Sequence, residues 1–155
     1  MKKIVVIIKG GLGNQLFCYG AARRLAIYSR SNLIIDDISG FKRDFTYKRI
    51  NSLQNFSLNY KKASYFERKE PFGRIRRKIS IGINKKKPFN KRRYIVQEGN
   101  DFDPRILDIK VKSKLFLDGY WQSELYFKDI EDIIRRDLQI QPPKDEDNLK
   151  MAEII

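Results

Sequence analysis

The sequence has no histidine among its 155 residues. Any proton transfer by this chain must therefore use a carboxylate, a lysine, a tyrosine or a cysteine. Metal sites built on imidazole ligands are excluded for the same reason. We expect no metal and no cofactor.

Cysteine and long apolar runs are also scarce. The single cysteine, Cys18, can form no internal disulfide, so nothing indicates an oxidising compartment. No apolar run approaches the ~18 residues that cross a membrane. The apolar run near the N-terminus is short and lacks the small-residue cleavage site of a signal peptide. We expect a cytoplasmic protein, either free or peripheral on the cytoplasmic face of the inner membrane.

Acidic residues are few beside basic ones, and the net charge is +14. Residues 61–95 hold 14 basic and 2 acidic residues, a net charge of +12. We interpret residues 61–93 as a basic insertion with one or two short helices. Its charge suits contact with an anionic membrane, and a solvated charged insertion explains it equally well. A polyanion- or nucleic-acid-binding protein is an alternative, but no nucleic-acid-binding motif accompanies the charge.

The chain is organised around a strand, a glycine turn and a helix near its N-terminus. Ile4–Ile8 is β-branched throughout, which is typical of a strand buried on both faces. Three glycines follow within Gly10–Gly13, and Asn14 can cap a helix that extends to about Arg30. Such a turn directs backbone N–H groups and the positive end of a helix dipole at one point, which suits a phosphate. A turn that merely joins a strand to a helix is the alternative.

Two known phosphate loops can be tested against this turn. The P-loop is excluded because no lysine follows the glycines. Gly11 and Gly13 fit the dinucleotide fingerprint, but Leu16 stands where its third glycine belongs. Asp36 follows a second predicted strand, Leu33–Ile35, about where a ribose-binding acid would fall. A dinucleotide-binding oxidoreductase therefore stays open as a hypothesis.

The remaining pattern predicts further α/β structure. Strands are expected over Tyr94–Val96 and Lys114–Tyr120, and helices over about Ser123–Leu138 and from Lys144 to Ile155. Together with the N-terminal unit they predict a Rossmann-like parallel sheet, with ligands outside the carboxyl ends of its strands.

Two short motifs in the second half have alternative interpretations. Asp101 and Asp103 match the Asp-x-Asp metal motif of nucleotide-sugar transferases, but a short helix capped by Asp103 with Pro104 at its first position is the simpler prediction. Trp121, beside an amide and a hydroxyl, is typical of a carbohydrate platform. A tryptophan that closes the core is the alternative.

Three sets of residues share an order and spacing with a known family. They are Gly10–Phe17, Tyr19 and Ala21; Gln97–Gly99 and Phe102–Asp103; and Leu117–Glu124, Tyr126–Phe127, Ile134–Arg135 and Asp137–Leu138. In this arrangement they resemble bacterial glycosyltransferase family 11, the α-1,2-fucosyltransferases. The resemblance covers nearly the whole chain except the basic segment.

The resemblance implies a GT-B-like fold. It also implies an inverting transfer of L-fucose from GDP-β-L-fucose to a galactose 2-hydroxyl of a glycan, without an essential metal. The product would belong to a surface polysaccharide or O-antigen. It places the donor diphosphate against Gly11, Gly13, Asn14 and Gln15. Candidates for the sugar and acceptor cleft are Asp36, Glu98, Tyr120, Trp121, Gln122, Ser123 and Glu124. The catalytic base is expected to be a carboxylate, with Asp36, Glu98 and Glu124 as candidates, and is not assigned.

One departure from the family limits these expectations. The family's main donor motif, His-x-Arg-Arg-x-Asp, needs a histidine, and this chain has none. Family members are also about twice as long. The resemblance therefore predicts that residues 1–155 form an N-terminal lobe without the C-terminal donor-binding lobe, and that the chain alone does not turn over.

Overall fold

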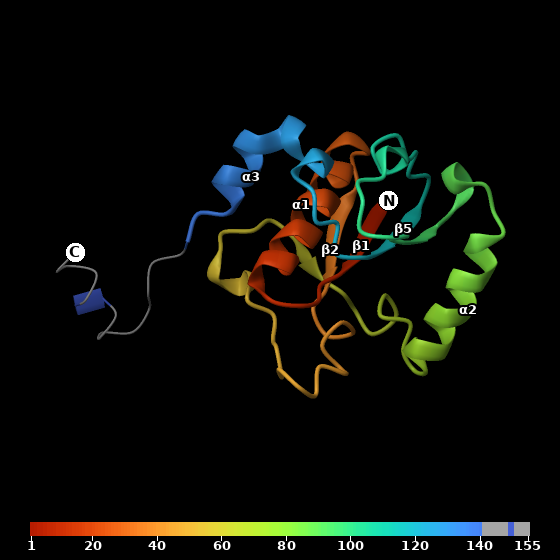
Figure 1. Cartoon of the computed structure of the whole chain (residues 1–155), viewed down its shortest axis with the longest axis horizontal. Helices are drawn as coiled ribbons and strands as arrows, with labels where there is room; N and C mark the ends of the chain where they lie inside the picture. The colour runs from red at the N-terminus through yellow and green to blue at the C-terminus, as the bar shows by residue number, and fades with distance from the viewer. Residues whose placement is uncertain (141–148, 151–155) are drawn as a thin grey trace.

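The computed structural model describes residues 1–140 and 149–150. Its fold is α/β, with a five-stranded, all-parallel, Rossmann-like sheet in the order β3-β2-β1-β5-β4 (Figure 1). The strands are β1 (Lys3–Ile7), β2 (Asn32–Asp36), β3 (Lys61–Lys62), β4 (Tyr94–Val96) and β5 (Lys114–Asp118). The helix expected from Lys144 to Ile155 lies outside the described residues, apart from residues 149 and 150.

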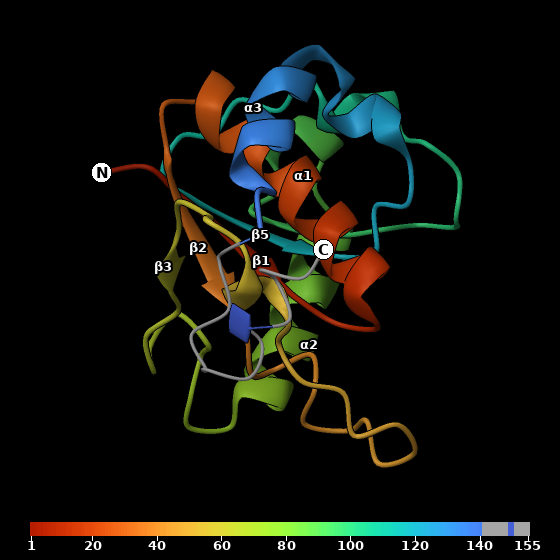
Figure 2. The same cartoon turned by 90° about the vertical axis from the view of Figure 1, so that its left-hand side faces the viewer.

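Helices cover both faces of the sheet. The α-helices are α1 (Leu12–Tyr28), α2 (Gly73–Lys85) and α3 (Glu131–Asp137). The 3₁₀ turns are η1 (Leu53–Asn55), η2 (Phe89–Lys91), η3 (Pro104–Ile106), η4 (Glu124–Tyr126) and η5 (Lys128–Ile130). α1 and α3 lie on one side of the sheet and α2 on the other (Figures 1 and 2). None of the helices within residues 1–140 and 149–150 is long and apolar enough to cross a membrane.

The core forms around β1, the central strand. Every residue from Ile4 to Ile8 is buried, as expected for a β-branched strand with neighbours on both faces. Ile4 and Val6 join the larger apolar cluster under α1, whereas Val5 joins a smaller cluster on the opposite face. The alternation follows from the two-residue period of a strand.

Two helix predictions need correction. α1 begins at Leu12 with Gly11 as its N-cap, so Asn14 lies inside the first turn and does not cap the helix. The single helix expected over Ser123–Leu138 is instead η4, η5 and α3. The break falls at Phe127, whose φ of −147° and ψ of 12° are not helical, and whose ring packs against Gly20.

The basic segment is tied into the sheet. Lys61 and Lys62 pair with Ile34 and Ile35 as β3, a strand that the sequence did not predict. The chain then passes through α2 and η2 to β4 at the opposite edge. The segment thus supplies the expected short helices and forms the crossover between the two sheet edges.

Asp103 caps a short helical turn, which is the simpler of the two predictions made for it. Its side chain accepts a hydrogen bond of 3.0 Å from the Arg105 backbone N–H, and Pro104 is the first residue of η3. Arg105 also binds this carboxylate, and the side-chain hydrogen bond holds the pKa of Asp103 below its ordinary value. Within residues 1–140 and 149–150, no group of three or more Asp, Glu or Cys side chains is placed to hold a metal ion.

Candidate anion-binding site

The order of the strands reverses direction between β1 and β5. From β1 the chain moves to β2 and β3 on one side, while β5 and β4 lie on the other. Open α/β sheets bind ligands outside the carboxyl ends of the strands at such a switch point. The glycine turn leaves β1 here, and residues 119–123 leave β5 beside it. The fold therefore brings together two motifs that are far apart in sequence.

The glycine turn has open space beside it. Gly10 has a φ of +76°, which disfavours other residues, and a Cβ there would lie 2.7 Å from Asn14 Nδ2 and 3.0 Å from the Tyr120 ring. A Cβ on Gly11 or Gly13 would meet nothing within 4 Å. The first N–H groups of a helix lack intrahelical partners. The start of the 17-residue α1 is therefore accessible to an anion.

Gln15 shapes the turn from within. Its buried side-chain amide donates hydrogen bonds of 3.0 Å to the carbonyls of Gly10 and Ile50. Its amide oxygen accepts a bond of 2.9 Å from the Ser52 N–H. Both amide hydrogens are thus used within the protein, so Gln15 positions the turn and the 50–52 segment and has no donor left for a ligand.

The tip after β5 is held against this turn. The Gln97 side-chain oxygen accepts hydrogen bonds from the N–H groups of Tyr120 (2.7 Å) and Trp121 (2.9 Å). Gln122 donates from its amide to the Asn14 side-chain oxygen, at 2.7 Å. Of the residues expected at the site, Asn14, Tyr120 and Gln122 therefore lie together. Gln97, which orders the tip, was marked in the sequence only by the family motif.

Trp121 closes the core. Its side chain is buried and its φ is +54°. Its ring meets the Tyr126 ring edge-on, with centroids 5.6 Å apart. Of the two interpretations of this residue, the core interpretation is confirmed. The exposed aromatic ring of the tip belongs to Tyr120, and the Lys9 ammonium lies 5.0 Å from its centroid.

Cys18 is the buried hydrophobe that the sequence predicts. Its thiol donates to the Gly119 carbonyl at 3.1 Å, across the base of the tip. Burial raises the pKa of Cys18 to about 12. The residue therefore stays a neutral thiol at physiological pH and does not act as a nucleophile.

The side chain of Asp36 makes its hydrogen bonds within its own segment of the chain. It is buried, and its Oδ1 accepts hydrogen bonds from the backbone N–H groups of Ile38 (3.2 Å) and Ser39 (2.9 Å). These bonds hold the turn that follows β2. Asp36 is only 2% exposed, so its carboxylate offers little surface to a nucleotide ribose, and this burial disfavours the dinucleotide hypothesis.

The other polar candidates for the sugar and acceptor cleft do not lie together in the structure. Glu98 is exposed and pairs with Arg92 at 3.3 Å. Glu124 is also exposed and pairs with Lys128 at 3.7 Å. Ser123 accepts a hydrogen bond from the Leu125 N–H and so caps η4. The three carboxylates considered as a base, Asp36, Glu98 and Glu124, lie in separate local environments.

A cavity of about 720 Å³ lies at the carboxyl ends of β1 and β5, between the turn after β2 and the start of α2. A volume of this size is typical of small-molecule sites. Five basic and two acidic residues line it, a net charge of +3: Lys9, Lys42, Arg43, Arg74 and Arg77, with Glu70 and Asp118. Sequence reasoning missed this cavity. The available signal was that Lys9 and Asp118 end two predicted strands.

Two of these cations are free to bind a ligand. Lys9 pairs with Asp118 at 2.7 Å, and Lys42 pairs with Glu70. Within residues 1–140 and 149–150, the side chains of Arg43 and Arg74 make no hydrogen bond, ion pair or ring contact. Guanidinium groups match phosphate oxygens with two parallel donors. The cavity is therefore best suited to a phosphate-bearing ligand.

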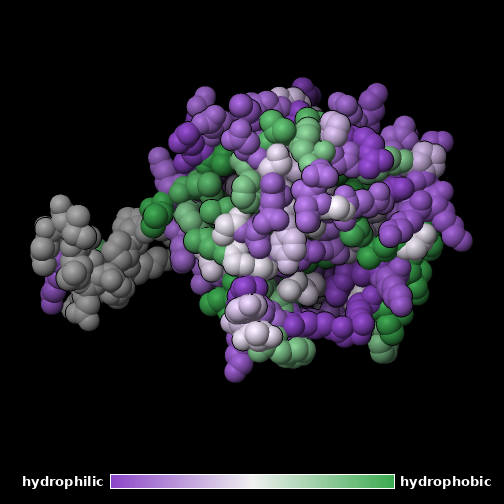
Figure 3. Space-filling view, in the orientation of Figure 1, coloured by the Kyte–Doolittle hydropathy of each residue, from purple (hydrophilic) through white to green (hydrophobic). Residues whose placement is uncertain are grey.

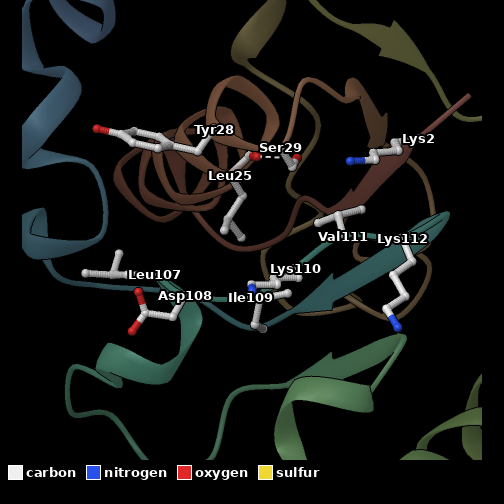
Figure 4. Close-up of a pocket in the computed structure, with 10 residues that line it drawn as sticks. All are labelled: Lys2, Leu25, Tyr28, Ser29, Leu107, Asp108, Ile109, Lys110, Val111 and Lys112. Atoms are coloured by element: carbon white, nitrogen blue, oxygen red, sulfur yellow. Dashed lines mark hydrogen bonds between the residues drawn. The ribbon is translucent and has the colours of Figure 1, made fainter.

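A second groove, of about 620 Å³, lies at the other end of the sheet (Figure 4). Leu25 of α1 lines it together with Ile109 and Val111, next to Lys2 and Lys112, which precede β1 and β5. This groove is therefore at the amino ends of the strands. It contains none of the residues that the sequence marked.

Comparisons with protein-family models, with curated proteins and with solved structures found no match to this chain. The fold and site define it as a Rossmann-like α/β protein with a basic cavity at the switch point of its sheet. The particular activity has to be argued from that site.

Proposed function

We propose that this chain forms the donor-diphosphate wall of an α-1,2-fucosyltransferase. The reaction moves L-fucose from GDP-β-L-fucose to a galactose 2-hydroxyl with inversion. The observation that carries the proposal is the basic cavity at the carboxyl ends of β1 and β5, where the glycine turn leads from β1 into α1. Lys9 joins the two features, because it lines the cavity and lies over the Tyr120 ring.

The chemistry needs positive charge at this place. The bond between fucose C1 and the diphosphate oxygen breaks as the galactose 2-hydroxyl oxygen bonds to C1 from the opposite face and gives its proton to a carboxylate base. Negative charge then grows on the GDP leaving group. Preorganised N–H groups of Gly11, Gly13 and Asn14, with the guanidinium groups of Arg43 and Arg74, would stabilise that charge. A charge at a helix end gains about 0.3–1 kcal/mol when exposed and up to ~2 when partly buried.

The geometry gives Gln15 a different role from the one the resemblance implies. Gln15, part of the implied donor loop, positions that loop through its three hydrogen bonds. Tyr120 and Gln122 present an exposed ring and an amide next to the turn, which suits contact with the transferred sugar or the acceptor. Trp121 supports this tip from the core.

Calorimetry with GDP-fucose, GDP, guanosine and NAD tests the ligand class. We expect GDP and GDP-fucose to bind at least about tenfold more tightly than guanosine, because the diphosphate provides most of the contacts. We expect NAD to bind no better than pyrophosphate, because Asp36 is buried and its Oδ1 already accepts two backbone N–H groups. NAD binding more tightly than GDP would favour the oxidoreductase alternative and contradict the proposal.

The acceptor half of the proposal needs its own measurement. Saturation-transfer NMR with a β-galactoside, in the presence of GDP, should show contact of the galactose ring with the protein. Gln122→Ala should weaken that contact, and Gln54→Ala, at an exposed position on η1, should leave it unchanged. A galactoside that gives no transfer signal with the wild-type chain would contradict an acceptor site here.

A further inference from the structure

We propose that α2, together with Phe72, is an interfacial helix that lies on an anionic lipid bilayer. The proposal does not depend on the function proposed above, because it follows from the exposed apolar face of α2 and the charges beside it, whatever ligand the cavity binds. In the sequence, the positive charge of residues 61–93 already suggested a membrane contact. The structure adds an apolar surface and identifies the residues that would enter the lipid.

The apolar side of α2 faces solvent. Ile75, Ile79 and Ile83 recur every four residues and are 58%, 56% and 53% exposed, and Phe72, just before the helix, is 71% exposed. At about 100° per residue these side chains share one face. Figure 3 shows hydrophobic surface at the edge of the molecule where Figure 1 places α2. We call these four residues the α2 stripe.

The opposite side of α2 is mainly polar, with Ile81 half-buried on it, and is the side attached to the protein. Asn84 is buried, and its side-chain oxygen accepts hydrogen bonds from the N–H groups of Arg93 (2.6 Å) and Tyr94 (3.2 Å) at β4. Arg77 donates to the Ser39 hydroxyl at 2.9 Å. These bonds fix the rotation of the helix about its axis, so the α2 stripe cannot turn inward without breaking them.

This arrangement is the reverse of the usual one. A helix that covers a sheet normally packs its apolar face on the sheet and exposes its polar face. Apolar surface in water is unfavourable, and an exposed apolar patch rimmed by polar residues marks an interaction site. The α2 stripe therefore requires an apolar partner outside the described fold.

The basic residues beside the α2 stripe indicate which kind of apolar partner it contacts. On a helical projection Arg76 falls on one side of the stripe, and Lys78 and Lys85 fall on the other. Lys86 and Lys87 continue the basic run. Apolar residues flanked by Lys and Arg are the pattern of helices that lie in the interface of an anionic membrane. A nucleic acid would use the charges but would have no use for the isoleucines.

The stripe also adjoins the basic cavity. Phe72 and Ile75 line that cavity, as does Phe45, which is itself 79% exposed. A helix bound at the lipid surface would therefore hold the cavity mouth close to the headgroups. If the cavity binds a sugar donor, as proposed above, this position suits an acceptor attached to a lipid carrier.

Vesicle co-sedimentation of the full chain, without any nucleotide, tests the proposal. The probes are phosphatidylcholine vesicles with and without about 30% phosphatidylglycerol, an anionic lipid. We expect binding to the anionic vesicles to be at least about tenfold stronger. Each of Ile75→Ser, Ile79→Ser and Ile83→Ser should weaken that binding about tenfold. Ile50→Ser, at a 68% exposed position outside α2, should not change it.

A fluorescence measurement separates insertion from adsorption. Trp121 is the single tryptophan and is buried, so Ile79→Trp adds a probe at the stripe. Its emission should shift to shorter wavelength on anionic vesicles and be quenched by brominated acyl chains. The same shift should be absent when the probe replaces Ile50 instead.

Three results would overturn the proposal. Binding that is lost in the basic variant Arg76→Gln/Lys78→Gln but unaffected by the isoleucine substitutions would indicate adsorption by charge alone. Self-association of the chain that Ile79→Ser abolishes, without vesicle binding, would make the stripe a protein interface. No shift of the Ile79→Trp emission would exclude insertion. None of these results bears on whether GDP binds.

Discussion

The amide of Gln122 donates a 2.7 Å hydrogen bond to the side-chain oxygen of Asn14, across a sequence separation of 108 residues. It connects the tip after β5 to the first turn of α1. Asn14 belongs to the glycine turn and Gln122 to the tip, two motifs that lie far apart in the sequence. Their contact makes the two motifs parts of one site at the switch point of the sheet.

A double-mutant cycle at this contact measures the connection directly. Asn14→Ala and Gln122→Ala should each lower the free energy of unfolding by no more than about 1 kcal/mol, because the bond is partly exposed. Their coupling energy should be about 0.5–1 kcal/mol by urea denaturation. Coupling indistinguishable from zero would mean that the turn and the tip are independent.

Gly13→Ala should raise stability and reduce diphosphate binding. Alanine is favoured over glycine in a helix by up to about 1 kcal/mol, and a Cβ at Gly13 meets nothing in the protein. The same Cβ would occupy the space beside the N–H groups at the start of α1. Thermal unfolding and GDP titration measure the two effects.

Gly82→Ala is the matched control for this substitution. Gly82 also lies in a helix, α2, and a Cβ added there would meet nothing within 4 Å, so the variant should gain similar stability and leave GDP affinity unchanged. Equal GDP affinity of the Gly13 variant and the wild type would argue against an anion at the turn.

Gly10→Ala should destabilise the protein by about 1–3 kcal/mol, because it places a Cβ at positive φ and against Asn14 and Tyr120. Gly99→Ala separates the two causes. Gly99 has nearly the same φ, +75°, but no atom within 4 Å of the place its Cβ would take, so it should show the backbone cost alone. A Gly10 variant no less stable than the Gly99 variant would mean that contact with Asn14 and Tyr120 adds nothing.

The acid stability of the chain should depend on Asp129. Hydrogen bonds from the largely buried Arg24 hold the pKa of Asp129 below its ordinary value. A lowered folded pKa means that the carboxylate adds stability above its unfolded pKa of about 3.9 and loses it as the pH falls through the folded pKa.

The variant that tests this is Asp129→Asn. It should be less stable than wild type at neutral pH, by about 1–3 kcal/mol, because the Arg24 cation loses its partner. The difference should shrink as the pH falls below about 4. Urea unfolding at several pH values measures it, with the exposed Asp132→Asn as the control. A difference that stays constant down to acid pH would rule out this ion pair as its source.

The sequence was sufficient for elements with a clear apolar pattern. β1 follows from its β-branched run, and β2, β4 and β5 were expected close to their observed positions. The first helix was also expected, although its start was placed two residues late, because Asn14 is a better cap by residue type than Gly11. Local chemistry cannot tell which of several small or polar residues within one helical turn takes the cap position.

Features that depend on tertiary pairing were not predictable. β3 consists of Lys61 and Lys62, whose side chains remain in solvent while their backbone pairs with β2. The sequence did not predict which face of α2 packs on the protein. In the structure its apolar face points to solvent. The cavity combines Arg43, from the irregular segment after β2, with Arg74, at the start of α2, so only the folded chain brings them together.

Trp121 illustrates the limit of motif reasoning at the site. The sequence allowed a carbohydrate platform or a core residue, and both fit an aromatic next to a turn. The backbone φ of +54° and the contact with Tyr126 place the ring in the core. Neither feature has a signature in the sequence, whereas the neighbouring Tyr120 is the ring left exposed.

The central claim is that a diphosphate binds between the glycine turn and the basic cavity. Amide-resolved NMR during titration of the ¹⁵N-labelled chain with GDP tests it most directly. We predict saturable shifts at Gly11, Gly13 and Asn14, lost in Arg43→Ala/Arg74→Ala and retained in Lys110→Ala/Lys112→Ala, which changes the groove at the opposite end of the sheet. Shifts confined to residues 107–112, or none at saturating GDP, would contradict the account.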